Sequence, residues 1–149
     1  MTKNEIQKLI SDLDSNAEAL VQQAAIQRLC QLQGADLNSL IMPGSKRNWE
    51  NAAKALSRIG YPGISPVISN LLEWLQDPNW PGADTVESLL CSVPKAELVS
   101  RLSISIAHAV AEADYMWLGS LKRLASRAKI VRGDFIDGND YDSLSLADW

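Results

Sequence analysis

Two pairs of carboxylates have the spacing that acid–base catalysis could use. Glu73 and Asp77 are four residues apart and Asp84 and Glu87 are three apart, so each pair would share one helix face. Such pairs serve as general acid and base where a cleft separates their pKa values. They also occur simply as the solvated faces of helices. We favour solvated faces, with the four carboxylates as an acidic rim that could meet a basic partner.

The other reactive side chains are few. His108 is the single histidine, and Cys30 and Cys91 are the two cysteines. Both cysteines follow a leucine inside an apolar helical pattern, which indicates small buried side chains with free thiols. A nucleophilic site would need a cysteine beside the histidine, and a zinc site would need more ligands than these. We therefore expect His108 on the surface, no catalytic residue, and no enzyme.

Acidic residues near the C-terminus match a calcium-binding loop in part. Asp137, Asn139 and Asp148 fall at positions one, three and twelve of an EF-hand frame, but the sixth position is Asp142 instead of glycine. A glycine-rich phosphate loop is also missing from the sequence. We expect neither a metal nor a cofactor.

The net charge of −4 is concentrated at the C-terminal end. Residues 132–149 hold five aspartates and one arginine, whereas residues 1–131 are balanced. Binding to a nucleic-acid backbone requires a basic face, so nucleic acid is an unlikely partner. A local basic cluster precedes the acidic segment and can pair with it inside the chain. It comprises Lys122, Arg123, Arg127, Lys129 and Arg132.

Targeting signals are not evident. The first residues contain no apolar run of signal-peptide length, and residues 102–111, the longest uncharged stretch of the second half, are far short of a membrane span of about 20 residues. These features predict a cytoplasmic protein that does not enter a membrane.

Helix signals dominate the chain. Thr2 and Glu5 have the spacing of a capping box, as do Ser15 and Glu18, and Asn48 and Asp114 are suitable N-caps. We expect helices that end near residues 10 and 31, followed by helices over residues 49–59, 65–76, 79–93, 95–111 and 114–131. In the helix that ends near residue 31 we expect one apolar stripe, formed by Leu20, Val21, Ala24, Ala25, Leu29 and Leu32.

An internal repeat accompanies these helices. Asn48-Trp49-x-x-Ala52 recurs as Asn79-Trp80-x-x-Ala83, and each copy opens a helix. Recurrence at this spacing is typical of an α-solenoid, although a non-repetitive bundle is the alternative. We predict an all-α fold of HEAT-like stacked helix pairs, an α-α superhelix of about six or seven helices. Residues 1–131 would form this domain, and residues 132–149 a non-helical acidic tail.

The segment LLEWLQDPNWP (residues 71–81) carries a resemblance to a known family. Together with WENAAK from residue 49 and DYMWL from residue 114, it resembles a bacterial family of uncharacterised small domains that is similar to HEAT-like repeat proteins. The resemblance spans roughly residues 38–125 and implies a fold but no catalytic residues. Pro78 departs from it, since family members often carry a bulkier residue there. The residues after 131 lie outside the resemblance.

Tryptophan is frequent, with five residues in the chain. We interpret most of them as wedges between adjacent repeats, and the structural signature comprises Trp49, Trp74, Trp80, Pro81 and Trp117. Tryptophan is also common in binding hot spots. Trp149 is the exception, because an apolar ring at the end of an acidic tail either docks on the body or reaches a partner. We include it among the candidate partner-binding residues.

These observations lead to a hypothesis about function. We expect a non-enzymatic helical-repeat module that binds a protein, and the small size and acidity suggest a bacterial immunity protein that neutralises a basic toxin. One alternative is an enzyme on a HEAT-like scaffold that acts on nucleic acid, which would require a basic groove and a buried carboxylate. Another is a purely structural or oligomeric domain.

Overall fold

The computed structural model describes residues 1–147. All regular secondary structure in this part of the chain is helical, with no strand. It contains eight α-helices and five 3-10 helices, so the predicted all-α class is confirmed and the helix count is slightly higher than predicted. The elements are α1 (Lys3–Ser11), α2 (Ala19–Leu29), η1 (Gly34–Leu40), η2 (Lys46–Asn48), α3 (Trp49–Ile59), η3 (Ser65–Val67), α4 (Ile68–Trp74), α5 (Ala83–Leu90), α6 (Lys95–Ala111), α7 (Tyr115–Arg127), η4 (Arg132–Asp134), α8 (Gly138–Asp142) and η5 (Ser143–Leu146).

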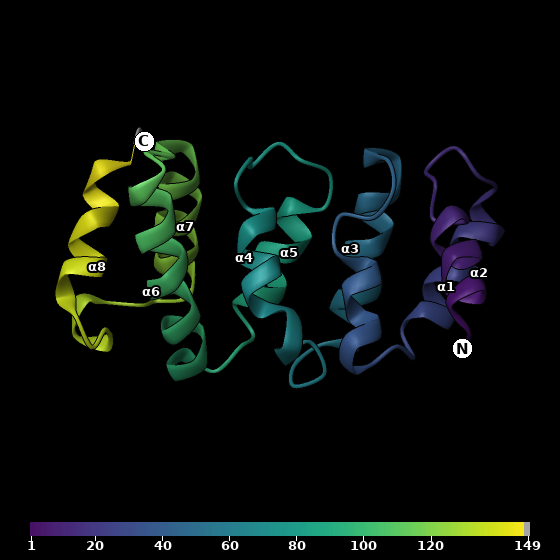
Figure 1. Cartoon of the computed structure of the whole chain (residues 1–149), viewed down its shortest axis with the longest axis horizontal. Helices are drawn as coiled ribbons and strands as arrows, with labels where there is room; N and C mark the ends of the chain where they lie inside the picture. The colour runs from purple at the N-terminus through teal and green to yellow at the C-terminus, as the bar shows by residue number, and fades with distance from the viewer. Residues whose placement is uncertain (148–149) are drawn as a thin grey trace.

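The helices stand side by side in a row that follows the chain from the N-terminus to α8 (Figure 1). On one side of the row α2, α3 and α5 contact one another in turn, and on the other side η1 contacts η3 and α4 contacts α6. Contacts across the row join α1 to α2, η1 to α3, α4 to α5 and α6 to α7. Each successive pair therefore contributes one element to each of two layers.

Side-chain caps begin two of these helices as predicted. The Glu5 backbone N–H donates to Thr2 Oγ1 at 3.1 Å, and the Thr2 N–H donates to a Glu5 carboxylate oxygen at 3.3 Å. At α7 the Trp117 N–H donates to Asp114 Oδ1 at 3.1 Å. These bonds satisfy N–H groups that a helix leaves without a partner in its first turn.

The predicted apolar stripe of α2 is wrong in part. Ala25, Leu29 and Leu32 are buried as predicted, but Leu20 is 78% exposed and Val21 39% exposed, and Ile26 is buried instead. The helix has apolar residues on two faces, and its contact with α3 decides which face is covered. The second capping box is also absent, because the Ser15 N–H donates instead to the Arg47 carbonyl oxygen at 3.0 Å.

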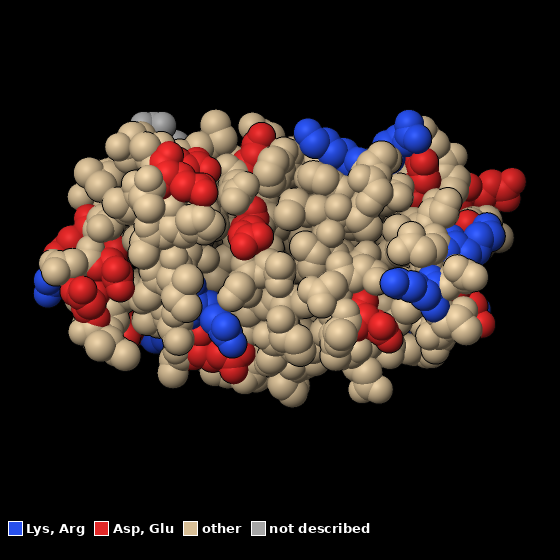
Figure 2. Space-filling model, viewed as in Figure 1, with Lys and Arg blue, Asp and Glu red and all other residues tan. Residues whose placement is uncertain are grey.

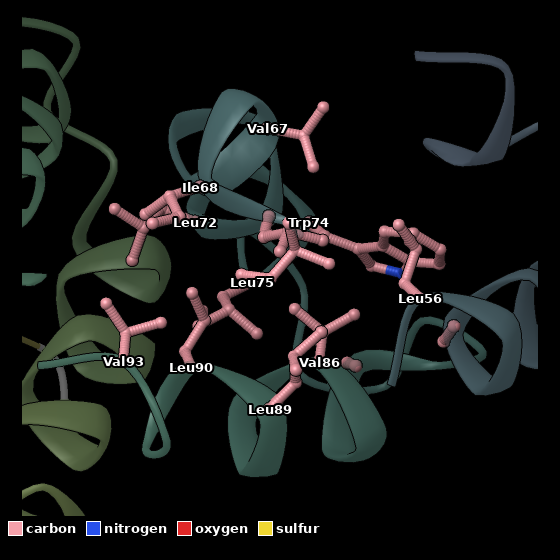
Figure 3. Packing of buried hydrophobic residues seen from close by; sticks show 14 of the residues in the cluster. Leu56, Val67, Ile68, Leu72, Trp74, Leu75, Val86, Leu89, Leu90 and Val93 are labelled. Atoms are coloured by element: carbon pink, nitrogen blue, oxygen red, sulfur yellow. The ribbon is translucent and has the colours of Figure 1, made fainter. Parts of the chain in front are cut away.

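The core runs through the whole row, and its centre lies between α4 and α5. Trp74 and Leu72 of α4 and Leu90 of α5 are fully buried there (Figure 3). Such large side chains contribute about 1.5–3 kcal/mol each by leaving water. Trp117 is also fully buried, and its Nε1 donates to the Leu72 carbonyl oxygen at 3.0 Å. The helix pair α6–α7 is therefore fastened to the preceding pair by a hydrogen bond as well as by packing.

The junction between α4 and α5 requires a glycine. Gly82 has φ +86°, and a Cβ atom placed there would lie 3.0 Å from the Ala53 Cβ, the Trp49 carbonyl oxygen and Trp74 Cζ2. This left-handed residue ends the turn, so α5 begins at Ala83 and not at residues 79–81 as predicted. The absence of a side chain allows α3 to pack closely against the start of α5.

The C-terminal segment was expected to be non-helical, and this expectation is wrong. Residues 138–142 form α8, and η4 and η5 flank it. Phe135 and Leu144 are buried in the same core as the rest of the chain, with α8 against α6 and η5 against α7. Two apolar anchors separated by one helix hold the segment in place, although its aspartates dominate the composition.

Candidate functional site

Three tryptophans of the predicted signature meet at the turn between α4 and α5. Trp49 is the first residue of α3, Trp74 is the last of α4, and Trp80 lies in the turn. The Trp49 ring centroid is 6.1 Å from that of Trp74 and 5.6 Å from that of Trp80, and both pairs meet edge to face. Aromatic rings favour this arrangement because the positive edge of one faces the negative face of another.

Hydrogen bonds fix the turn that carries Trp80. Trp74 Nε1 donates to the Pro81 carbonyl oxygen at 3.0 Å, and the Asn79 N–H donates to Asp77 Oδ1 at 2.8 Å. The Trp80 N–H donates to the Asp77 carbonyl oxygen at 3.1 Å. The turn is therefore stabilised by two side chains, the buried indole of Trp74 and the half-buried carboxylate of Asp77.

A cation lies against this aromatic cluster. Lys46 Nζ is 5.9 Å from the Trp49 ring centroid and 6.0 Å from that of Trp80. Both distances fall within the range at which an ammonium group is attracted by a ring face. Asn48, predicted as an N-cap, does not cap α3 with its side chain, and its Oδ1 is buried without a hydrogen-bond partner among the described residues.

Beside the cluster is a hollow of about 390 Å³, which we call the acidic hollow. Trp80 and two carboxylates, Glu50 and Asp84, line it together with the turn residues. Glu50 lies in the first turn of α3 and Asp84 in the first turn of α5, and these two helices are neighbours. Both carboxylates are exposed, so the hollow presents negative charge next to an aromatic ring. Its lining residues are Glu50, Pro78, Asn79, Trp80, Pro81, Gly82 and Asp84.

The predicted acidic rim is only partly assembled. Asp84 lines the acidic hollow, whereas Glu73 and Asp77 are half-buried and do not line it, and Asp77 accepts a hydrogen bond within the turn. On the face drawn in Figure 2, acidic side chains gather at the left end, where α8 lies, and elsewhere form separate small groups with a broad uncharged area between them. A continuous acidic strip is therefore not seen on that face. Trp149 lies outside the described residues.

Glu87 does not belong to a solvated face. Its side chain is only 3% exposed, and it accepts hydrogen bonds from Arg123 Nε at 3.2 and 3.0 Å. Arg127 Nη1 lies 3.2 Å from Glu87 Oε1, and Arg123 Nη2 also reaches Asp84 Oδ1 at 3.2 Å. Bonding to Glu87 raises the pKa of Arg123. Glu87 braces α5 to α7, and its oxygens are occupied by arginines from within the chain.

Of the expected pairing between the basic cluster and the acidic C-terminal segment, the described residues show one contact, made by Arg132, whereas two other arginines pair with Glu87 of α5. Arg123 and Arg127 contact Glu87, and Arg132 Nε lies 3.0 Å from Asp142 Oδ1. Pairing with Arg132 lowers the pKa of Asp142. These contacts join residues that are ten to about forty positions apart, so spacing could indicate the pairing but not the partners.

The other reactive side chains lie apart from the acidic hollow. His108 is exposed as expected, with Nε2 3.0 Å from a Glu112 oxygen and its ring edge to face with Trp117. Cys30 and Cys91 are half-buried free thiols that follow α2 and α5, and burial raises the pKa of both. A thiol with a raised pKa is a poor nucleophile at neutral pH.

Within residues 1–147, no group of three or more His, Cys, Asp or Glu side chains is placed to hold a metal ion. Asp148, which the calcium frame would need, lies outside the described residues. Across that same part of the chain, each helix is too short or too polar to cross a membrane.

Sequence reasoning missed Glu50 and Lys46. Glu50 was visible only as the residue after Trp49, and Lys46 as a cation three residues before it. A charge beside a tryptophan at a helix start is a usable signal once two such helices are known to be neighbours. That neighbour relation between α3 and α5 comes from the fold.

The arrangement defines an all-helical domain with an aromatic cluster and an acidic hollow at one inter-helix turn. Residues 41–132 match the model of the family described as Domain of unknown function (DUF5071), and the chain belongs to that family. The matched residues include the whole tryptophan cluster and α7. Searches of curated proteins and of solved structures found no match.

Proposed function

We propose that this chain is a non-enzymatic, HEAT-like helical-repeat module that binds a basic protein partner in the bacterial cytoplasm. The placement of one element of each pair in each of two layers supports the repeat reading, because stacked pairs bury a continuous core and leave extended surfaces for binding. Toxin neutralisation, as by an immunity protein, is the form of this function that the small size and acidic hollow favour.

The observation that carries the proposal is that Trp80, Glu50 and Asp84 line the same hollow. An arginine or lysine side chain entering it would find a carboxylate for its charge and a ring face for its stem. Trp80 is half-buried and packs edge to face against Trp49, and tryptophan is one of the residues most enriched in binding hot spots.

Contacts within the chain support the proposed attraction of cations to this site. Lys46 already lies over Trp49 and Trp80, and Arg123 already reaches Asp84. The Asp84 side chain is 90% exposed in this ion pair, and such surface pairs contribute about 0–1 kcal/mol. A partner's arginine can replace Arg123 at Asp84 at low cost, while Arg123 keeps Glu87 as its main acceptor.

The test uses a short peptide with two arginines and the same peptide with citrulline, which has the same shape without the charge. Binding is followed in ¹H–¹⁵N spectra through the indole N–H of Trp80, assigned by comparison with Trp80→Phe. We expect the arginine peptide to shift this signal and the citrulline peptide to bind about tenfold more weakly.

The variants locate the site. The double change Glu50→Gln and Asp84→Asn should reduce affinity for the arginine peptide by about tenfold, and Asp36→Asn, at an exposed aspartate of η1, should leave it unchanged. Equal binding of the two peptides, or equal affinity of the double variant and the native chain, would contradict the proposal.

A further inference from the structure

A second and larger hollow lies at the other end of the row, between α7 and the C-terminal segment. Its volume is about 790 Å³, within the range of small-molecule sites. One part of its lining comes from α7, inside the family match, and the other from residues 141–145, outside it. We call it the C-terminal cavity. Its wall includes Ala125, Ile130 and Leu144, and its polar lining includes Lys122, Ser126 and Lys129.

The wall of the C-terminal cavity is apolar and well packed. Ala125, Ile130 and Leu144 are each less than 5% exposed and belong to the main core. These side chains form the floor of the cavity, and the apolar surface that a ligand can cover belongs mainly to Val131, which is exposed, and Tyr141, which is half-buried. Covering such surface is favourable by about 25 cal/mol per Å².

The charge of the cavity is positive. Lys122 and Ser126 are four residues apart on one face of α7, and Lys129, which follows the end of the helix, lines the same cavity. Among the described residues no carboxylate lies within 4.0 Å of either lysine ammonium group. Asp142 is the single acidic residue of the lining, and Arg132 pairs with it at 3.0 and 3.1 Å.

The backbone at Lys129 supplies an independent argument. Lys129 follows α7 with φ +58°, a left-handed conformation in which glycine is strongly favoured. A residue with a Cβ atom in this conformation costs about 1–2 kcal/mol in steric strain. The Ile130 N–H donates to the Ala125 carbonyl oxygen at 2.8 Å, and Lys95 Nζ donates to the Lys129 carbonyl oxygen at 2.9 Å, so the conformation is firmly held. Met42 and Ala113 also have positive φ in this chain, but Lys129 is the one of the three whose side chain lines the cavity, which gives its ammonium group a place to act.

From these features we infer that the C-terminal cavity binds a small amphipathic organic anion, a carboxylate attached to an aromatic or aliphatic body. The body would lie against Val131 and Tyr141, and the carboxylate would accept from Lys122, Lys129 and the Ser126 hydroxyl. This inference goes beyond the proposed function, since the cavity and the acidic hollow use different helices and opposite charges.

The probe for this site is 1-naphthaleneacetate, with the neutral 1-naphthaleneacetamide as its matched analogue. Both are titrated into the full chain at pH 7 and followed by ¹H–¹⁵N spectra. We expect the carboxylate to shift signals of residues 122–131 and 141–145, and the amide to bind at least about tenfold more weakly. Shifts scattered over the chain, equal affinity for both compounds, or no shift at millimolar carboxylate would overturn the inference.

Three variants separate binding from folding. Lys122→Gln with Lys129→Gln should weaken the carboxylate by about tenfold or more, whereas Lys54→Gln, at an exposed lysine of α3, should not. Lys129→Gly removes the side chain but suits the backbone, so it should weaken binding while leaving thermal stability equal or higher. A Lys129→Gly protein that binds as tightly as the native chain would count against a role for this ammonium group.

Discussion

The indole nitrogen of Trp117 donates a 3.0 Å hydrogen bond to the carbonyl oxygen of Leu72, which lies 45 positions earlier in the chain. Leu72 is in the last turn of α4, where carbonyl groups lack partners within the helix. The same oxygen accepts from the Leu75 N–H at 3.1 Å. The Trp117 side chain thus supplies a hydrogen-bond donor to the C-terminal end of α4, a helix of the preceding pair.

Replacing Trp117 by phenylalanine should lower the free energy of unfolding by about 1.5–3 kcal/mol. The ring would become smaller in a fully buried site and the donor would be lost, but the Leu75 N–H would still satisfy the carbonyl in part. Urea denaturation measures the change. Trp80→Phe, at a half-buried ring in the turn, is the control and should cost clearly less. Equal losses would show that ring size alone matters.

Much of the fold was predictable because its signals are local. The Thr2–Glu5 capping box and the Asp114 cap depend on residues within one helical turn, and both were correct. The apolar face of α2 was only partly correct, since Ala25 and Leu29 are buried as predicted but Leu20 is exposed and Ile26, on another side of the helix, is buried. Which side is buried depends on α3, and a single helix carries no information about its neighbour.

The site was less predictable, for the same reason. Asp84 and Glu87 have equivalent spacing signals, yet Asp84 is exposed and Glu87 is buried. The difference arises from Arg123 and Arg127, which reach α5 from a helix 36 or more residues away. Helix pattern alone could not reveal that one carboxylate of the pair would have two guanidinium partners.

Gly82→Ala should lower the free energy of unfolding by about 3 kcal/mol, because strain at φ +86° adds to a close approach of three atoms at 3.0 Å. Gly34→Ala is the control. Gly34 also has a positive φ of +59°, but an added Cβ would meet nothing within 4 Å, so only the backbone strain of about 1 kcal/mol remains. Chemical denaturation of both variants gives the comparison. Equal costs would mean that α3 and α5 can move apart.

Glu87→Gln should lower the free energy of unfolding by about 2 kcal/mol, because a buried carboxylate that two arginines bond is replaced by a neutral amide. Asp84→Asn removes a carboxylate from the same Arg123, but at a side chain that is 90% exposed, and should cost at most about 0.5 kcal/mol. A double-mutant cycle of Glu87→Gln with Arg123→Gln should give a coupling energy of about 1–2 kcal/mol. A coupling energy near zero would rule out the brace between α5 and α7.

Phe135→Ala tests whether the C-terminal segment is part of the packed core. Phe135 is 7% exposed, so its truncation should cost about 2–3 kcal/mol, below the full range for central phenylalanines because it lies near the end of the row. The adjacent Ile136 is fully exposed, and Ile136→Ala should change stability by less than about 0.5 kcal/mol. Differential scanning calorimetry distinguishes the two. Similar melting temperatures for both variants would show that the segment unfolds separately.

Acid should loosen the C-terminal segment before it unfolds the rest of the chain. The Val131 N–H, donating at 2.8 Å, holds the pKa of Asp134 below its ordinary value of 3.8, and pairing with Arg132 does the same for Asp142. A carboxyl group whose folded pKa is depressed stabilises the folded state above its unfolded pKa, and that contribution is lost as pH falls through the folded value.

The loss is therefore expected below about pH 3.8, and not between pH 5 and 8. Backbone amide shifts of residues 135–147, followed from pH 6 to pH 2, should move in this window while those of α3 and α4 still report a folded core. Asp142→Asn removes one of the two titrating contacts, so its segment should be less tightly docked at pH 6 and change less on acidification. A transition of α3 and α8 at the same pH in the native chain would instead indicate a single cooperative unit.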